Sequence, residues 1–333
     1  MADIAITTEL QEIQNNLWGT NVRENIALAL EKLQNLPEEP NTIQGSLKNS
    51  KLSLLKVSIQ NMENTLQSRK DQLDRIKARL EQASGRTILQ YGKCGNDVYY
   101  AICDDGEAAL YGTGATYDYT SHDSVFYQNG QIKKIVLSNG ITGLGDRLFY
   151  HCANAETVSL PATLTSIGDS AFAQEDAAIG YTAGLTSVTI PQAVTAIQSY
   201  AFYHTAIAEV TVPASVKTWG KYVFSGCAKL KTARVACDSI GAFAFTRCTA
   251  LSSLTISANC TKIGTCMLTY CSSLTEITYE GTKAQWDAIE KGTNWDSRHG
   301  ADHNDEDVLS KIICSDGNWI FNEETKTWEE ETA

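Results

Sequence analysis

The segment LPATLTSIGDSAF occupies residues 160–172, and its order of residue types returns along the chain from residue 132 onward. Each copy contains a short run of residues that favour β-strands. The runs are IVL (135–137), VSL (158–160), VTI (188–190), VTV (210–212), ARV (233–235), LTI (254–256) and ITY (277–279). Their last residues are 23, 30, 22, 23, 21 and 23 positions apart, and the longest step contains an insertion around Gln174 to Gly184.

Two further positions recur in these copies at fixed distances from the strand. The first is a central apolar residue, and the second is a cysteine three residues later. The central residues are Phe149, Phe172, Phe202, Phe224, Phe245 and Leu268, and the cysteines are Cys152, Cys227, Cys248 and Cys271. A period near 22 with one strand per unit predicts a solenoid, because one unit cannot bury its apolar face alone. We expect the phenylalanines to fill its centre and the cysteines to be small buried side chains without disulfides.

The repeat reads approximately strand–Pro–xx–Ile–Gly–xx–Ala–Phe–xx–Cys–xx–Leu and resembles the BspA-like leucine-rich repeat, most closely in residues 160–172 and 222–232. The resemblance extends over about residues 86–320. It implies a β-hairpin cap over 86–131, six repeats and a final strand over 132–279, and a C-terminal cap with an acidic tail over 280–333. Within the hairpin cap, Gly112 to Gly114 is expected to form a turn.

Upstream of the repeats, residues 46–84 carry apolar residues at alternating steps of three and four. The seam residues are Leu52, Leu55, Ile59, Met62, Leu66, Arg69, Leu73, Ile76 and Leu80. This spacing is typical of a coiled coil and predicts an oligomerisation stalk over 41–85. By analogy with fibres, a homotrimer is expected. The alternative is an amphipathic helix packed on its own chain.

The first residues resemble a second class of proteins. Residues 6–33, ITTELQEIQNNLWGTNVRENIALALEKL, are similar to the opening of tail-fibre and baseplate proteins of phages that infect Gram-positive bacteria. The resemblance includes a Gly–x–x–Val–Arg run from Gly19 to Arg23 and implies a helical attachment segment over 1–40. The expected fold class is therefore α+β: N-terminal helices and a coiled-coil stalk, followed by a leucine-rich-repeat solenoid with two caps.

Composition excludes several function classes. The chain has 27 Lys plus Arg against 39 Asp plus Glu, a net charge of −12, and no basic block. Nucleic-acid binding is not expected, because it requires a surface that neutralises phosphates. No apolar run approaches the roughly 18 residues of a membrane span, and the N-terminus shows no readable export signal.

Candidate catalytic and metal sites have simpler explanations. Gly168–Asp169–Ser170 resembles a hydrolase nucleophile motif, but it falls on the Ile–Gly–x–x–Ala–Phe part of the repeat. His299, Asp302, His303, Asp305 and Asp307 are capable of binding a metal, but Gly300 and Asn304 favour a solvated acidic loop. We therefore expect no enzymatic activity, no cofactor and no metal.

A binding surface is the remaining possibility. Tyrosine and arginine are enriched at interfaces, and several such residues follow the central apolar position. The candidates there are Tyr150, His151, Tyr203, His204, Arg247 and Tyr270. Arg234 belongs to another row, the outward residues of the strands, with Val136, Ser159, Thr189, Thr211, Thr255 and Thr278. The alternatives are tyrosines packed on the neighbouring unit, and a plain solvated face of the sheet.

Two functions fit these observations. The first is a phage or prophage tail-fibre or receptor-binding protein of the virion, which attaches to tail or baseplate proteins through its N-terminus. Its repeats would bind a glycan or protein on the bacterial host surface, and several tips on one stalk would add avidity. The alternative is a bacterial cell-surface or extracellular adhesin or host-interaction protein of the BspA-like class.

Overall fold

The computed structural model of the chain describes residues 85–120, 122–174, 183–296 and 309–331, together with isolated positions between 53 and 81. The chain divides into two compact units, Met1–Ile88 and Leu89–Ala333. Within the described residues, no helix is both long and apolar enough to cross a membrane.

The expected α+β fold class with a coiled-coil stalk is wrong for the described part of the chain, which is mostly β. Its one helix with defined bounds is α4 (Lys283–Asp287). Isolated positions from Ser53 to Glu81 have helical backbone, and Gly85, with φ +67°, follows them. Of the nine seam residues, Ile59 alone is described, and it is half-buried. Heptad spacing cannot by itself establish a coiled coil, because a seam requires a partner helix. The attachment segment 1–40 lies outside the described residues.

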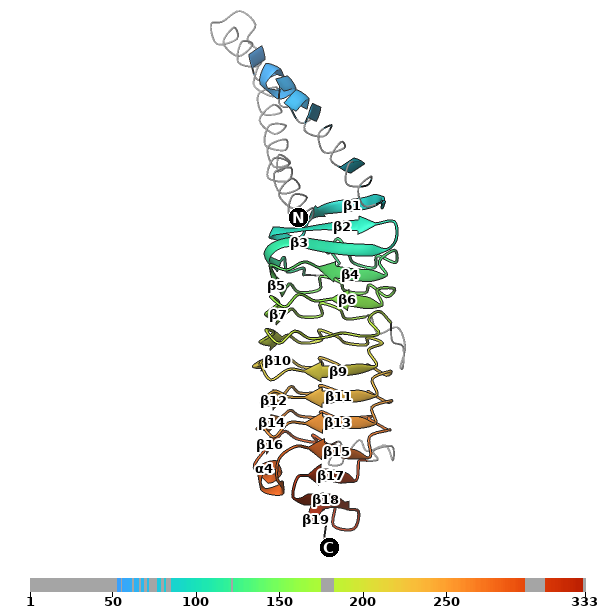
Figure 1. The fold of residues 1–333 in the computed structure, drawn as a ribbon, viewed down its shortest axis with the longest axis vertical. Helices are drawn as coiled ribbons and strands as arrows, with labels where there is room; N and C mark the ends of the chain where they lie inside the picture. The colour runs from blue at the N-terminus through green and yellow to red at the C-terminus, as the bar shows by residue number, and fades with distance from the viewer. Residues whose placement is uncertain are drawn as a thin grey trace, which may run out of the picture. The chain divides into compact units, whose positions relative to one another are not determined.

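The second unit is a solenoid whose successive coils stack their strands in parallel (Figure 1). Its long strands keep one register, so that Val212, Val235 and Ile256 lie side by side. The long strands are β4 (Lys134–Leu137), β6 (Thr157–Ser159), β9 (Glu209–Val212), β11 (Thr232–Val235), β13 (Ser253–Ile256), β15 (Glu276–Tyr279) and β17 (Lys311–Cys314).

Each coil also contains a second, short strand, which corrects the expectation of one strand per unit. This strand ends at or next to the apolar residue that precedes the recurring glycine, and its neighbours pair in parallel. All of these strands except β5 are two residues long, which is too short to show a periodicity in the sequence. The short strands are β5 (Ile141–Leu144), β7 (Ser166–Ile167), β8 (Ala196–Ile197), β10 (Thr218–Trp219), β12 (Ser239–Ile240), β14 (Lys262–Ile263) and β16 (Glu290–Lys291).

The long-strand sheet is interrupted at the coil that follows the insertion. Residues 187–190 form no strand, and an isolated bridge joins Thr157 to Ser187. The sheet that contains β6 and the sheet that begins with β9 are therefore separate. Residues 175–182 lie outside the described residues.

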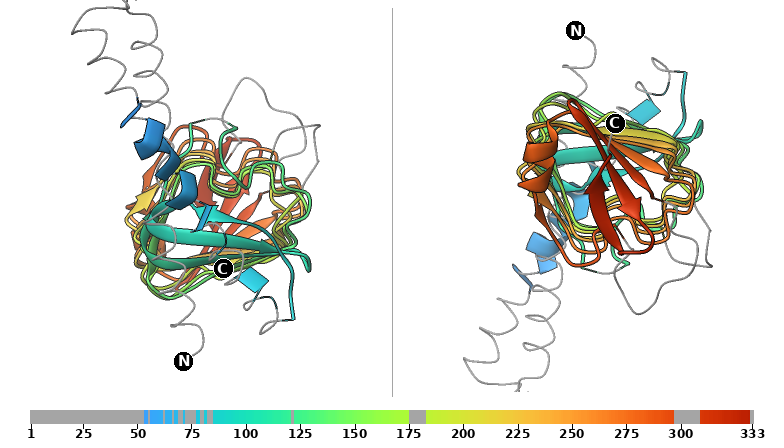
Figure 2. Two further views of the ribbon diagram at one scale, coloured as in Figure 1. Left: turned by 90° about the horizontal axis from the view of Figure 1, so that it is seen from above. Right: turned by 90° about the horizontal axis from the view of Figure 1, so that it is seen from below.

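Both ends of the solenoid are covered by antiparallel strands (Figure 2). At one end, β1 (Ile88–Lys93) is followed by β2 (Gly95–Cys103) and β3 (Glu107–Thr116), and β3 continues into both parallel ladders. At the other end, β17 pairs with β18 (Gly317–Asn322), which pairs with β19 (Thr327–Glu330). β2 and β3 pair antiparallel with a turn at 104–106. The expected turn at Gly112 to Gly114 is wrong, because these residues belong to β3.

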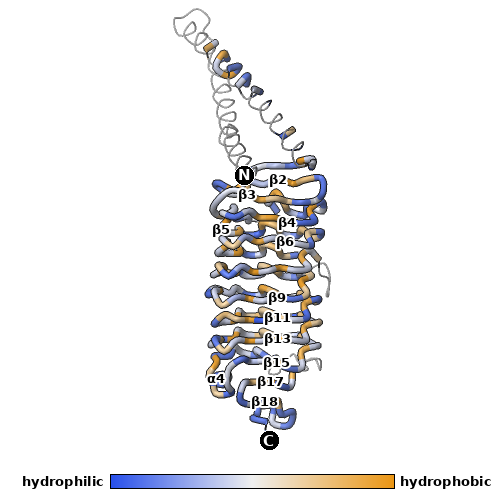
Figure 3. The backbone as a smooth tube through the Cα atoms, in the orientation of Figure 1, coloured by the Kyte–Doolittle hydropathy of each residue, from blue (hydrophilic) through white to orange (hydrophobic). Residues whose placement is uncertain are grey.

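The core is a continuous column of stacked phenylalanine rings, as expected. Phe149, Phe172, Phe202, Phe224 and Phe245 are each at most 1% exposed, and consecutive rings lie 5.3–5.9 Å apart within 10° of parallel. Hydrophobic and hydrophilic residues recur at matching places in successive coils (Figure 3). The rings of Phe172, Phe202 and Phe224 are therefore covered on both faces by neighbouring rings, which is how repeating units bury their apolar sides.

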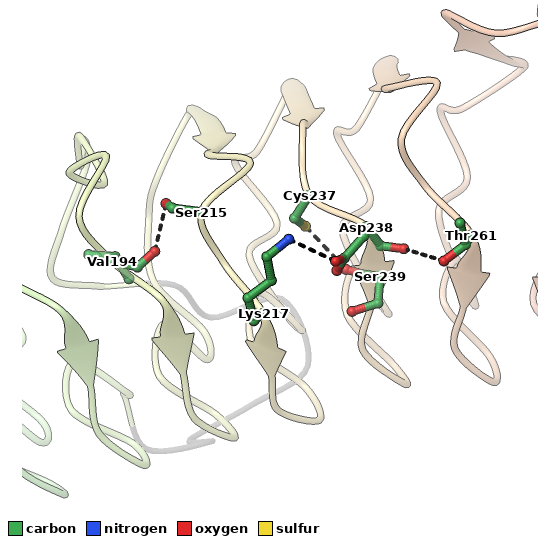
Figure 4. A network of polar contacts seen from close by, with 7 residues as sticks. All are labelled: Val194, Ser215, Lys217, Cys237, Asp238, Ser239 and Thr261. Carbon is green, nitrogen blue, oxygen red and sulfur yellow. Dashed lines mark hydrogen bonds and ion pairs between the residues drawn. The ribbon is translucent and has the colours of Figure 1, made fainter.

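The glycine that follows every short strand except β8 permits close approach of neighbouring coils. A Cβ atom on Gly220 would lie 2.2 Å from the backbone nitrogen of Ser199, and one on Gly264 would lie 2.4 Å from that of Ala242. Polar contacts also join the coils (Figure 4). The Thr261 hydroxyl donates to the carbonyl of Asp238 at 3.1 Å, and Lys217 pairs with the Asp238 carboxylate at 2.8 Å.

The cysteine column is buried and free of disulfides, as predicted. Each thiol lies against a backbone carbonyl of the preceding coil: Cys227 Sγ is 3.2 Å from the oxygen of Phe202, and Cys248 Sγ is 3.1 Å from that of Phe224. Cys152 and Cys271 make the same contact. The recurrence of cysteine is thus explained by a small side chain that is also a weak donor.

Burial of these thiols makes the stability of the fold depend on pH in the alkaline range. Desolvation raises the pKa of Cys152 and of Cys227 from 9.0 to about 12. Between these values the unfolded chain loses the proton and the folded chain keeps it, so stability is complete below pH 9 and falls as pH rises toward the folded pKa. In that window we expect each thiol to lower the free energy of unfolding by up to about 1.4 kcal/mol per pH unit. Urea unfolding at about pH 8 and about pH 10 measures this, and Cys227→Ala should flatten the slope. An unchanged slope would contradict it.

Candidate functional site

Each coil exposes a turn between its short strand and the next long strand, and we call the side formed by these turns the turn face. Up to two positions per coil, four residues apart, have left-handed backbone there. The first series is Arg147, Ser170, Tyr200, Tyr222, Phe243 and Cys266, with φ from 51° to 59°; the second is His151, His204, Gly226, Arg247 and Tyr270, with φ from 56° to 72°. For residues other than glycine this conformation costs about 1 kcal/mol each.

Hydrogen bonds between neighbouring coils offset that cost. The amides of Tyr200, Phe202 and His204 donate to the carbonyls of Lys221, Val223 and Ser225 at 2.9–3.0 Å. The turns therefore form a third ladder beside the two sheets, in which alternate amides point to the next coil. Side chains on this face are consequently carried by a rigid backbone.

Five rings gather near the middle of the turn face, and we call them the central aromatic cluster: Tyr200, Tyr203, His204, Tyr222 and Phe243. The Tyr200 and Tyr222 rings stack at 4.9 Å, and the Tyr222 and Phe243 rings stack at 4.4 Å, both within 8° of parallel. Tyr203 meets Tyr200 edge-on at 5.4 Å and lies 4.2 Å from His204. Tyr200 is 37% exposed, while Tyr222 and Phe243 are half-buried.

His204 is nearly fully buried because the next coil has no side chain at the equivalent position. A Cβ atom on Gly226 would lie 2.1 Å from Cδ2 of the His204 ring. Glycine is favoured at position 226 because the backbone there has a φ of 72° and because any side chain would overlap the His204 ring. His204 therefore packs against Tyr203 inside the cluster, and it has little solvent-exposed surface that a partner could contact.

A second group of rings lies toward the N-terminal cap. The His122 and Tyr127 rings are 4.4 Å apart, and Tyr127 stacks on Tyr150 at 5.9 Å. His151 lies 6.4 Å from both tyrosines. The Arg147 guanidinium lies 6.0 Å from the Tyr150 ring and donates to the Thr120 carbonyl.

The predicted binding residues therefore separate into several places. Tyr150 and His151 belong to the second group of rings, Tyr203 and His204 to the central aromatic cluster, and Arg247 packs over Tyr270 at 5.8 Å. Arg234 lies apart, on the outward side of β11, where it forms a bidentate ion pair with Glu280. Its row contains exposed Thr211 and Thr278, as expected of a solvated sheet face.

Sequence reasoning missed Tyr200, Tyr222 and Phe243. They stand two residues before the central phenylalanines Phe202, Phe224 and Phe245. The repeat alignment could have indicated them, since three consecutive copies carry an aromatic residue at this offset. Only the structure shows that the offset has left-handed backbone and brings the rings into a stack.

A cleft of about 340 Å³ lies near the ends of the short strands β5, β7 and β8. Its lining residues are Asp118, Leu144, Asp146, Ser166, Gly168, Asp169 and Gln198. The pKa of Asp146 is raised, first by desolvation and then by the charges of Asp118 and Asp169. The pKa of Tyr200 is also raised, by burial and by the nearby Tyr222 and Asp169. The cleft therefore gathers three carboxylates, and the charge of Arg147 opposes the rise in the pKa of Asp146.

The motif Gly168–Asp169–Ser170 is part of this cleft. The Ser170 hydroxyl donates to Asp169 Oδ1 at 2.6 Å, and Ser170 itself is buried. Within the described residues, no group of three or more His, Cys, Asp or Glu side chains is arranged to hold a metal ion. The residues from His299 to Asp307 lie outside the described part of the chain.

Comparison with known proteins identifies the family. Residues 120–179 and 175–289 match the BspA type leucine-rich repeat region, in six copies. These matches together span just over half of the 333 residues, and the chain belongs to this family. The match includes the repeats and does not extend to residues 6–33, for which the resemblance to phage tail proteins is not shown. A search of curated proteins gave no significant match.

Solved structures of leucine-rich repeat proteins are similar to the chain at low identity. One from Eubacterium ventriosum is 18% identical over 67% of this chain and 93% of its own, with a TM-score of 0.34. The Treponema pallidum leucine-rich repeat protein is 18% identical over 62% and 83%, with a TM-score of 0.35. A leucine-rich cell surface protein from Faecalibacterium prausnitzii is 15% identical over 59% and 96%, with a TM-score of 0.19.

Proposed function

We propose that this protein is a non-enzymatic binding protein, a cell-surface or extracellular adhesin of the BspA-like class, whose turn face contacts a partner. The observation that carries the proposal is the central aromatic cluster. Tyrosine is enriched where proteins bind one another, and here Tyr200 and Tyr222 occupy backbone positions that disfavour large side chains. Strained positions that persist are a reason to look for function.

The alternative of a phage tail protein has less support. It depends on residues 6–33 and on the seam residues between 52 and 80, and the family match includes neither. The repeats alone account for a rigid scaffold that presents side chains at a fixed spacing. A surface-binding role therefore does not depend on residues 6–33 or on the seam residues.

The experiment compares binding of the full chain to intact bacterial cells and to mammalian cells, with two double variants. Tyr200→Asn with Tyr222→Asn removes two rings, and asparagine tolerates the left-handed backbone. We expect binding to fall at least about thirtyfold, equivalent to about 2 kcal/mol, as for a small hot spot.

The matched control is Thr211→Ala with Thr255→Ala, which also changes two side chains but on the sheet face. It should leave binding within about twofold, since such positions are energetically near-neutral in interfaces. Circular dichroism must show that both variants remain folded. Binding that is lost in the control, or retained without the two rings, would contradict the proposal.

A further inference from the structure

Basic side chains are concentrated on the part of the turn face that holds the central aromatic cluster. The turns that contain or directly follow the cluster span 198–208, 220–231, 241–252 and 264–275, and they include no Asp or Glu. Their basic residues are Lys221, Lys229, Lys231 and Arg247, all exposed. The two preceding turns carry carboxylates, among them Asp146 and Asp169. In a chain of net charge −12, this part of the turn face is therefore locally positive.

Other basic residues on the same coils are neutralised by ion pairs, and those on the turn face are not. The pairs off the turn face are Lys217–Asp238, Arg234–Glu280 and Lys262–Glu290. Within the described residues, none of the four basic side chains on the turn face forms an ion pair. Arg247 packs over the Tyr270 ring, which carries no charge to oppose it. The positive charge on these turns is thus left for a partner to compensate.

The rings of the central aromatic cluster add a second preference for negative charge. Tyr222 has Tyr200 on one face at 4.9 Å and Phe243 on the other at 4.4 Å, so its half-buried ring presents its edge and hydroxyl to solvent. An aromatic ring is electron-rich on its faces and electron-poor along its edge. A stack approached from its edges therefore favours an anion, whereas a cation requires a free face.

Backbone hydrogen bonds hold the basic residues beside these rings. Lys221 directly precedes Tyr222, and its carbonyl accepts from the amide of Tyr200 at 2.9 Å. Arg247 follows Phe243 by four residues, and its amide donates to the carbonyl of Thr269 at 2.7 Å. Since each turn is bonded to the next coil, the charges and the rings keep fixed relative positions. Such preorganisation lowers the entropic cost of binding.

We propose that this part of the turn face binds an acidic segment, rich in Asp and Glu, of a protein partner. The inference rests on the proposed binding function of the turn face and specifies its partner. Lysine and arginine donate charge-assisted hydrogen bonds to carboxylates, and tyrosine and arginine are enriched among the residues that dominate protein interfaces. At physiological ionic strength charges act over about 8 Å, so a segment bound here responds mainly to the nearby cations. An anionic polysaccharide has the same charge but packs its sugar rings on aromatic faces, and both faces of Tyr222 are covered.

The test measures binding of a fluorescent peptide, Gly-Glu-Gly-Glu-Gly-Glu-Gly, to the full chain by fluorescence anisotropy. A second peptide with Gln in place of each Glu keeps the length and removes the charge. We expect the Glu peptide to bind at least about tenfold more tightly than the Gln peptide, with affinity that falls as salt rises. Equal binding of the two peptides, or no binding at about millimolar protein, would overturn the proposal.

Two double variants of equal net charge locate the site. Lys221→Gln with Lys229→Gln removes two cations from the turn face and should weaken binding of the Glu peptide about tenfold. The matched control, Lys217→Gln with Lys262→Gln, removes two cations that lie off the turn face and should change binding less than about twofold. Circular dichroism must show that both variants are folded. Equal effects of the two variants would show that net charge alone governs binding, and the proposal would be wrong.

Two further outcomes separate the chemistry of the partner from the adhesive function. If a sulfated oligosaccharide with as many charges as the Glu peptide binds more tightly than the peptide, the partner is a glycan and the proposal is overturned. If cell binding depends on Tyr200 and Tyr222 but is unchanged by Lys221→Gln with Lys229→Gln, the acidic partner is wrong and the adhesive function stands.

Discussion

Phe224→Ala should lower the free energy of unfolding by about 3–5 kcal/mol. Phe224 is fully buried, and its ring lies 5.3 Å from that of Phe202 and 5.9 Å from that of Phe245. The substitution removes one member of the column and leaves a cavity between two coils, which lose their shared interface. In a solenoid each coil contacts only its neighbours, so the lost contact is not replaced by more distant ones. Urea unfolding followed by tryptophan fluorescence measures the effect.

Phe243→Ala is the matched control, since it removes the same ring one coil away from a half-buried site. Its cost should stay below about 1.5 kcal/mol, because less apolar area is lost and alanine is under no greater backbone strain at φ 59°. Equal losses from the two variants would show that the phenylalanine column is not the main source of cohesion. The prediction would then be wrong even if both proteins were destabilised.

Gly220→Ala should also destabilise the protein strongly, with a loss of about 3 kcal/mol. The new Cβ atom would lie 2.2 Å from the nitrogen of Ser199 and 2.5 Å from the carbonyl carbon of Gln198. Both are backbone atoms, so no side-chain rotation relieves the overlap, and the two coils must separate. Separation would also lengthen the bond from the Gly220 amide to the Ile197 carbonyl, now 2.8 Å. Thermal unfolding and urea titration should both report the loss.

Gln198→Ala is the control, because it changes the equivalent position of another coil without creating an overlap. Gln198 stands where other coils have glycine and is exposed, so the chain already accommodates a Cβ atom there. The variant should change stability by no more than about 0.5 kcal/mol. If Gly220→Ala proves equally mild, close approach of the coils is not what requires glycine.

Much of the solenoid was predictable from the spacing of particular residues. The recurring phenylalanines, the cysteines and the strand-forming runs each return near a 22-residue period, and a period of that kind is a local property of the chain. Their burial followed from the same argument, because stacked units hide identical positions. The short strands were missed because two residues such as Ser239–Ile240 have no periodicity of their own.

The candidate site was only partly predictable. Tyr203 and His204 could be named as candidates, because they follow Phe202, but Tyr200, Tyr222 and Phe243 were not named. Their arrangement depends on left-handed backbone, which residues other than glycine rarely adopt and which a sequence therefore does not indicate. Arg234 was assigned to binding from its outward position, and its pairing with Glu280 depends on two residues 46 positions apart.

The sequence by itself determined the repeat, its period, the apolar column and the acidic balance of the chain, since all of these follow from which residues stand at which intervals. The tertiary structure alone decided which side chains meet across coils: the stack of Tyr200, Tyr222 and Phe243, the cleft of Asp146 and Asp169, and the thiol contacts of the cysteines. The physical reason is that stacking brings together residues that are a whole coil apart in the chain. Their separation is then set by backbone hydrogen bonds between coils, and no local pattern encodes that distance.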